Sequence, residues 1–133
     1  MILRQVETAV ILVFAAAALS LLTSVHSQTA PEGLQISADK IDFGQAAVDS
    51  DSPPRTITLS NLTRSNITMQ QIITSGIDFS QKNDCGQILA PGARCSIQVF
   101  FKPAISGPRI GNLDVMGSDP ASPHFIGLTG IGK

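Results

Sequence analysis

The sequence predicts an all-β fold: a single antiparallel β-sandwich that follows an N-terminal signal peptide. Three observations indicate it. Short runs of alternating polar and apolar residues follow one another, clusters of Pro, Gly, Ser and Asp separate them, and no segment shows a convincing helical periodicity. About seven short strands spaced roughly 8 to 15 residues apart are typical of a domain built from two packed sheets.

The N-terminus has the layout of a secretory signal peptide. Arg4 supplies a positive charge, residues 9–22 form an apolar run broken only by Ser20, and small or tolerated residues lead up to Ser27. We therefore expect cleavage after Ser27 and export to the periplasm or the medium. An uncleaved membrane anchor is the alternative, but the run is shorter than the roughly 20 apolar residues that span a bilayer.

Cleavage would leave 106 of the 133 residues, which suits one domain with one core. We expect a signal peptide over residues 1–27, a flexible polar lead over 28–33 and the sandwich over 34–133. No second apolar stretch follows the signal, so no membrane anchor is expected after cleavage.

The balance of charge and the aromatic content argue against several ligands. Nine Lys and Arg residues stand against ten Asp and Glu, a formal net charge of −1. Nucleic acids and anionic membranes require clustered basic residues, so neither is an expected partner. The chain has no Trp or Tyr, which makes sugar binding by aromatic stacking unfavourable.

The expected strands are recognised by their period of two. In residues 56–60, Ile57 and Leu59 should face the core while hydroxyl residues face outward. Phe43, followed by Gly44 at a turn, should also enter the core. The other expected strands lie at residues 67–74, 77–79, 95–102, around Leu113 and Val115, and around Ile126 and Leu128.

Cys85 and Cys95 are the only cysteines, and the turn at residues 90–92 can bring them together. In an oxidising compartment we expect them to form a structural disulfide. A loop of about 11 residues would stabilise the fold by roughly 2.5–3 kcal/mol. A redox motif needs a closer spacing and a zinc site needs more ligands, so both are less favoured.

Phe100 occupies a position where the alternation predicts a polar side chain. It shares its face of the strand with Ser96, Gln98 and Lys102, so it should be half exposed unless it is covered. One interpretation is that a loop or residues 34–37 lie over it. The other is that Phe100 contacts a partner or a second copy of the chain, because exposed apolar patches often mark contacts.

No catalytic constellation is evident, and we expect no enzyme activity and no cofactor. Without the signal, His124 is the only histidine, and we interpret it as a solvated residue at the start of a strand. No Gly-x-Ser-x-Gly elbow is present, and the Ser-x-x-Lys at residues 37–40 is attributed to chance.

Asp49 and Asp51 could bind a hard cation, but we interpret them as residues of a solvated turn. Asn61 and Asn66 begin N-glycosylation sequons, whose use the sequence does not decide.

An ordered series of short motifs resembles the bacterial choice-of-anchor D domain. That family is similar to the ASPM/SPD-2/Hydin (ASH) immunoglobulin-like domains, whose fold resembles the PapD and major sperm protein sandwiches. The motifs are Asp42-Phe43-Gly44, a strand ending at Asn61, Asp78-Phe79, residues 85–97, Val99 to Pro103, Gly107, residues 111–113 and 128–132. One departure is Asn61-Leu62-Thr63, because the family usually has Gly two residues after the Asn.

The resemblance implies a non-catalytic, exported module with a structural or protein-interaction role. The expected partner is another envelope or extracellular protein, with Phe100 as a possible contact. The alternative is a cell-surface module that binds a cation or a glycan.

Overall fold

The computed structural model describes residues 33–133, which form nine strands. They are β1 (Leu34–Ile36), β2 (Lys40–Ala46), β3 (Arg55–Asn61), β4 (Ile67–Ser75), β5 (Phe79–Asn83), β6 (Ile88–Leu89), β7 (Arg94–Phe101), β8 (Gly107–Gly117) and β9 (His124–Gly132). The all-β prediction is confirmed.

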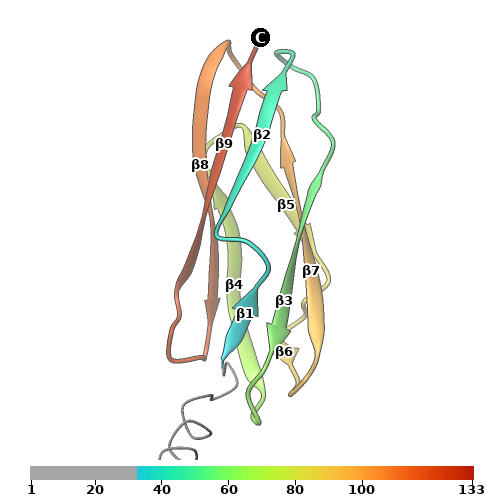
Figure 1. The fold of residues 1–133 in the computed structure, drawn as a ribbon, viewed down its shortest axis with the longest axis vertical. Coiled ribbons are helices and arrows are strands. Elements are labelled where there is room, and N and C mark those ends of the chain that lie inside the picture. Colours follow the sequence, from blue (N-terminus) through green and yellow to red (C-terminus); the bar gives the residue numbers. More distant parts are fainter. Residues whose placement is uncertain (1–32) are drawn as a thin grey trace, which may run out of the picture. The chain divides into compact units, whose positions relative to one another are not determined.

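The strands form two sheets that pack face to face (Figure 1). The four-stranded sheet has the order β1-β3-β7-β5, and the five-stranded sheet has the order β2-β9-β8-β4-β6. Neighbouring strands are antiparallel with one exception, because β2 runs parallel to β9. The five-stranded sheet is therefore mixed, whereas the sequence predicted a purely antiparallel sandwich.

The core lies between the sheets and follows from the alternation along each strand. Ile57 and Leu59 of β3 are completely buried, as predicted. Phe43, Phe79 and Phe101 form an aromatic cluster in which ring centroids lie 5.1 to 6.0 Å apart. The other buried apolar residues include Ile97, Val99, Leu113, Val115, Ile126 and Leu128.

The structure corrects the predicted strand at residues 77–79. Ile77 is 85% exposed and lies in the turn that precedes β5, which begins only at Phe79. The turn forms because Gly76 has a φ of 91° and its carbonyl accepts a hydrogen bond from Phe79 N. Strands β1, β2 and β6 were not predicted. Two of them have three residues or fewer, and the third changes register between Asp42 and Gln45.

The predicted signal peptide over residues 1–27 and the lead over residues 28–32 lie outside the described residues. Gly33, the last residue of the predicted lead, is fixed, since its carbonyl accepts a hydrogen bond of 2.9 Å from Leu62 N. Within residues 33–133, no helix is long and apolar enough to cross a membrane.

Candidate functional site

The outer face of the four-stranded sheet is lined by hydroxyl and amide side chains. Cross-strand pairing places Thr56 of β3 opposite Gln98 of β7, and Gln98 opposite Lys82 of β5. Two strand positions away, Ser80 of β5 is opposite Phe100 of β7. We term this surface, with Thr58 and Ser96, the polar face.

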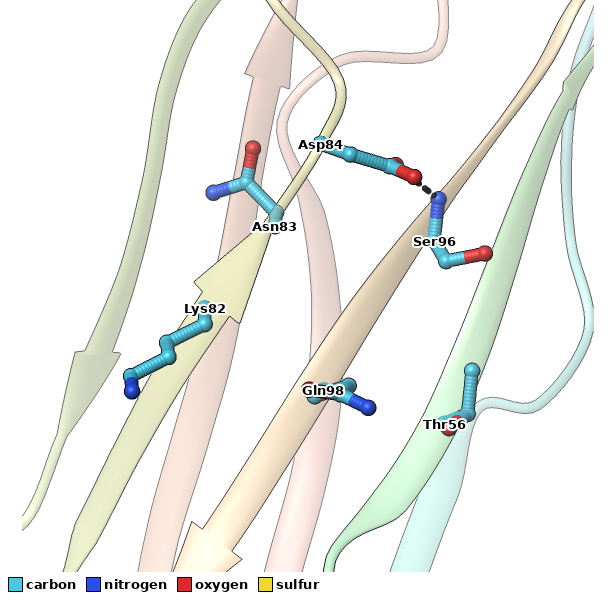
Figure 2. A pocket seen from close by; sticks show the side chains of 6 residues that line it. All are labelled: Thr56, Lys82, Asn83, Asp84, Ser96 and Gln98. Atoms are coloured by element: carbon cyan, nitrogen blue, oxygen red, sulfur yellow. Dashed lines mark hydrogen bonds between the residues drawn. The ribbon is translucent and has the colours of Figure 1, made fainter.

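A groove of about 430 Å³ lies on the polar face, with β7 between β3 and β5 (Figure 2). Its lining residues are Thr56, Lys82, Asn83, Asp84, Ser96 and Gln98. Asp84 extends across to β7, where its Oδ1 accepts a hydrogen bond of 2.7 Å from Ser96 N (Figure 2). The groove therefore offers donors and acceptors from three adjacent strands, and Lys82 and Asp84 are its only charged side chains.

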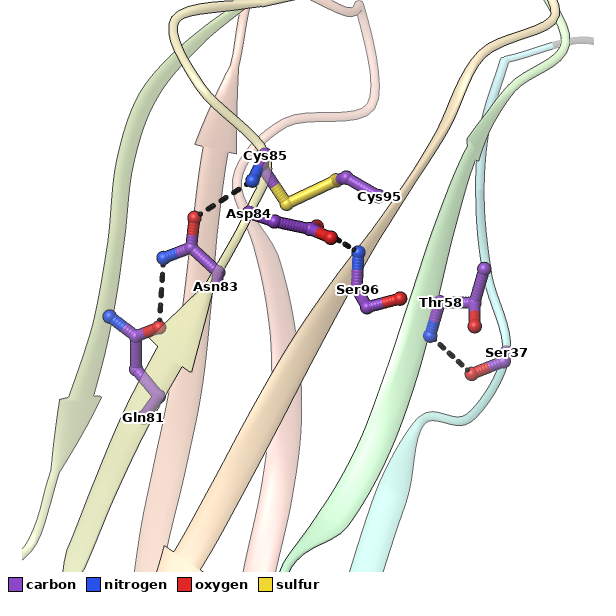
Figure 3. Close-up of a disulfide and its surroundings, with 8 residues drawn as sticks. All are labelled: Ser37, Thr58, Gln81, Asn83, Asp84, Cys85, Cys95 and Ser96. Atoms are coloured by element: carbon purple, nitrogen blue, oxygen red, sulfur yellow. Dashed lines mark hydrogen bonds between the residues drawn. A yellow bond between two sulfur atoms is a disulfide. The ribbon is translucent and has the colours of Figure 1, made fainter.

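The predicted disulfide between Cys85 and Cys95 anchors one end of the groove (Figure 3). Both cysteines are at least 95% buried. Beside the bridge, Cys85 N donates to Asn83 Oδ1, and Asn83 Nδ2 donates to Gln81 Oε1 (Figure 3). Gln81 Nε2 also donates to Ile72 O of β4, which joins the two sheets. This network fixes the backbone that carries Asp84.

Phe100 is half-buried on the polar face, as its place in the alternation predicted. Residues 34–37 do not lie over it, because β1 pairs with the end of β3 near Asn61. Phe100 lies beyond the opposite end of β3, where Arg55 is paired with Val99 of β7. The nearest cation is Lys82, whose Nζ lies 5.9 Å from the centroid of the Phe100 ring. Because Phe100 is only half-buried, part of its ring is accessible on the polar face beside the groove.

Asn61 is a structural residue and not an accessible sequon. It is completely buried, and its Nδ2 donates hydrogen bonds of 2.8 Å to Ser65 O and Leu89 O. Its Oδ1 accepts from the backbone N and the hydroxyl of Thr63. These four bonds use all the hydrogen-bonding groups of the side-chain amide, so a glycosylating enzyme cannot reach Asn61 in the folded protein. Asn66, in contrast, is exposed.

The sequence did not predict a partly buried ion pair between Asp78 and Arg109. Arg109 Nε lies 2.8 Å from Asp78 Oδ2, and Asp78 Oδ1 accepts a hydrogen bond from Ala104 N. Burial acts to raise the pKa of Asp78, but the Ala104 hydrogen bond and the Arg109 guanidinium outweigh it and hold the pKa below its usual value. The Asp78-Phe79 motif was the only sequence signal for this site.

His124 begins β9 as predicted, but it is not solvated. Its side chain is 15% exposed, and Nε2 lies 2.7 Å from the buried Asp119 Oδ2. The correction has a simple reason: His124 is opposite Val115, which faces inward, so the ring points toward the core side of the β8–β9 connection.

The candidate cation positions do not assemble a metal site within residues 33–133. Asp49 and Asp51 are exposed, as expected for a solvated turn. The ligand atoms of Asp84, Cys85 and Cys95 lie within 4.8 Å of one another. Because both sulfurs belong to the disulfide, this group leaves a single carboxylate.

Comparison with protein families gives a match that covers nearly all of the described residues. Residues 33–130 match the family described as the HYDIN/CFA65/VesB-like, Ig-like domain. No curated protein matches the chain in sequence. The narrower resemblance to the choice-of-anchor D domain stays a prediction.

Solved structures share the fold at low sequence identity. The ASH/PapD-like domain 7 of human CEP192 has a TM-score of 0.58 and 15% identity, over 80% of this chain and 91% of that one. A protein of unknown function from Porphyromonas gingivalis has a TM-score of 0.64 and 14% identity, over 79% of this chain and 50% of that one. The VesB protease of Vibrio cholerae has a TM-score of 0.59 and 16% identity, over 75% and 31%. The chain thus spans half of the Porphyromonas protein and less than a third of VesB.

Proposed function

We propose that this chain, which belongs to the HYDIN/CFA65/VesB-like family of Ig-like domains, is a non-catalytic, exported module that binds another envelope or extracellular protein. The observation that carries the proposal is the groove on the polar face with the half-buried Phe100 beside it. Export is supported by the intradomain disulfide, since such bonds persist in oxidising compartments, and by the signal-like composition of the N-terminus.

The groove has the composition of a protein contact. Thr56, Gln98 and Lys82 line it with hydrogen-bonding groups, and Phe100, the next outward residue of β7 after Gln98, offers an apolar ring beside it. Protein interfaces commonly combine an aromatic anchor with a polar rim. The disulfide and the Asp84–Ser96 hydrogen bond hold the floor in place, which lowers the entropy cost of binding.

Among the described residues that line the same groove, no nucleophile is hydrogen-bonded to a general base. Its lining contains neither His nor Cys, and Asp84, its one carboxylate, already accepts a backbone hydrogen bond. General acid–base and nucleophilic catalysis both depend on a reactive group within hydrogen-bond reach of a substrate. A role in recognition therefore suits this surface better than turnover.

The test is partner capture with matched variants. A photo-crosslinking residue at Gln98 should join the protein to one specific partner in the native envelope fraction. Phe100→Ser and Lys82→Glu should abolish that crosslink with little change in the melting temperature, whereas Phe125→Ser, on the other sheet, should retain it. A crosslink that survives both polar-face variants, or none at all in correctly exported protein, would contradict the proposal.

A glycan is the second candidate ligand. Four of the six lining side chains, those of Thr56, Asn83, Ser96 and Gln98, carry neutral hydroxyl or amide groups that can bind sugar hydroxyls. A cation is less favoured because Asp84 is the only lining carboxylate. A rise in melting temperature with a monosaccharide panel that Gln98→Ala removes would favour the glycan, and a calcium-dependent rise that Asp84→Asn removes would favour the cation.

A further inference from the structure

The outer face of the five-stranded sheet carries exposed apolar side chains. Phe125 and Ile131 of β9 are 62% and 41% exposed, Ile110 of β8 is 76% exposed, and Ile73 of β4 is 40% exposed. Strand pairing puts them on one surface, with Ile73, Asp114 and Phe125 as consecutive cross-strand partners. We term this surface the apolar face. Its composition contrasts with that of the polar face on the opposite side of the sandwich.

Three charged groups lie on the outward face of the strands that flank β9, and one of them, Asp42 of β2, already accepts a hydrogen bond from Gly44 N through its Oδ1. Asp114 of β8 is opposite Phe125, and Lys40 of β2 is opposite Gly127. Within residues 33–133 neither Asp114 nor Lys40 forms an ion pair, and Asp114 Oδ1 is buried without a hydrogen-bond partner. Because the Asp114 residue as a whole is half-buried, a cation brought by another molecule would stabilise its negative charge across a short distance, without contact to Oδ1 itself.

We infer that the apolar face pairs two copies of this chain about a two-fold axis that runs along β9. A half turn about such an axis lays β8 of one copy over β2 of the other, because these strands lie on either side of β9. Asp114 of each copy then approaches Lys40 of the other, so the same ion pair forms twice. Asp114 lies at the level of Phe125 and Lys40 at the level of Gly127, so the two charges are offset by two residues along the strand. This offset is about 7 Å, which a lysine side chain can span.

The side chains on the axis also suit a self-contact. The outward residues of β9 are Phe125, Gly127, Thr129 and Ile131, none of which is charged. Each would meet its own copy. Gly127 adds no side chain to this row, and a Cβ added there would have only Lys40 Cβ, at 3.9 Å, within 4 Å. An axis across the strands at the level of Phe125 would instead set Asp114 against its own copy, which like-charge repulsion disfavours.

Sedimentation velocity of the protein purified after export tests the inference, over a concentration range of about 1 µM to 1 mM. We expect monomer to convert to dimer as concentration rises. Phe125→Ser should raise the dimer dissociation constant by about tenfold or more. Phe100→Ser, on the polar face, should leave the constant unchanged, and the melting temperature should confirm that each variant is folded.

A charge exchange gives the sharpest outcome. Asp114→Lys and Lys40→Asp should each weaken the dimer by about tenfold, and the double variant should return the dissociation constant to within about threefold of the original. A protein that stays monomeric throughout, or a double variant no better than the singles, would overturn the inference. A crosslinker at position 125 that captures a different protein in place of a second copy would also overturn it, by assigning the apolar face to that protein.

Discussion

Arg109 Nε donates a hydrogen bond of 2.8 Å to Asp78 Oδ2, and this partly buried pair ties the five-stranded sheet to the turn that leads into β5. Asp78 also organises the connection from β7 to β8, because its carboxylate accepts from Ala104 N and its backbone carbonyl accepts from Lys102 N. The Asp78 carboxylate thus joins three segments at the same end of the sandwich: its own turn before β5, the β7–β8 connection and β8.

We predict that this pair makes the fold sensitive to acid. The pKa of Asp78 is lowered in the folded state, so below about pH 4 the unfolded chain binds the proton more readily than the folded chain. The stabilisation is therefore present above the unfolded pKa and is lost as the pH falls through the folded value. Urea unfolding of the wild type and Asp78→Asn should show a smaller drop in the free energy of unfolding for the variant between about pH 4 and pH 2. Equal drops would assign the acid sensitivity to other carboxylates.

The second prediction concerns the disulfide. Replacing both Cys85 and Cys95 with Ala should lower the free energy of unfolding by about 2.5–3 kcal/mol, because the unfolded chain regains the entropy of the open loop. Chemical denaturation with and without a reductant measures this. The reductant should destabilise the wild type by a similar amount and leave the double variant unaffected. A wild type insensitive to full reduction would show that the bridge adds little to stability.

The two asparagines of the sequons provide a matched pair. Asn61→Ala removes four hydrogen bonds and strands the buried carbonyl of Leu89, so it should cost about 2–4 kcal/mol. Asn66→Ala, at an exposed position, should change the free energy of unfolding by less than about 0.5 kcal/mol. Thermal and urea denaturation would check both. In a host that glycosylates, mass spectrometry should find a glycan only at Asn66, and a glycan at Asn61 on folded protein would contradict the buried geometry.

Two glycines of β9 should respond in opposite ways to the same change. A Cβ at Gly130 would come within 2.5 Å of the Phe101 ring, so Gly130→Ala should destabilise the fold by about 1–3 kcal/mol. Gly127→Ala places its Cβ in open space and should be neutral or slightly stabilising. Melting temperatures of the two variants test the packing at the aromatic cluster. The order of the two effects matters most, and its reversal would mean that Gly130 does not abut Phe101.

The neighbouring phenylalanines of β7 form another contrast. Phe101 is completely buried between Phe43 and Phe79, so Phe101→Ala should cost about 3–5 kcal/mol. Phe100→Ser should cost less than about 1 kcal/mol because part of its ring is already in contact with water. Equilibrium unfolding measures both. A large loss of stability for Phe100→Ser would place that ring in the core and remove it from the candidate site.

The sequence predicted best what the alternation within one strand determines. The period of two in β3 and β7 was enough to predict that Ile57 and Leu59 are buried and that Phe100 lies on the outer surface. It did not predict β2, because the register changes near Gly44 and its pairing with β9 joins residues more than 80 positions apart. A local pattern carries no information about such a partner.

The composition of the candidate site was mostly hidden for the same reason. Phe100 could be identified from its own strand, but Lys82 and Ser80 become its neighbours only through the pairing of β5 with β7. The role of Asp78 likewise depends on Arg109, which lies 31 residues further along the chain. Nothing in the sequence indicated that Asp119 contacts His124, so His124 was predicted to be a solvated residue. In the structure Asp119 holds it at the end of the sandwich.

The parallel pairing of β2 with β9 has a mechanical consequence. The two strands belong to opposite ends of the described chain, and the backbone hydrogen bond from Lys133 N to Ala46 O continues their pairing past the end of β9. Tension applied between Lys40 and Lys133 would pull β2 and β9 past each other along their length, so their hydrogen bonds would share the load and break together rather than one at a time. We therefore expect the domain to resist stretching along this direction more strongly than its modest size suggests.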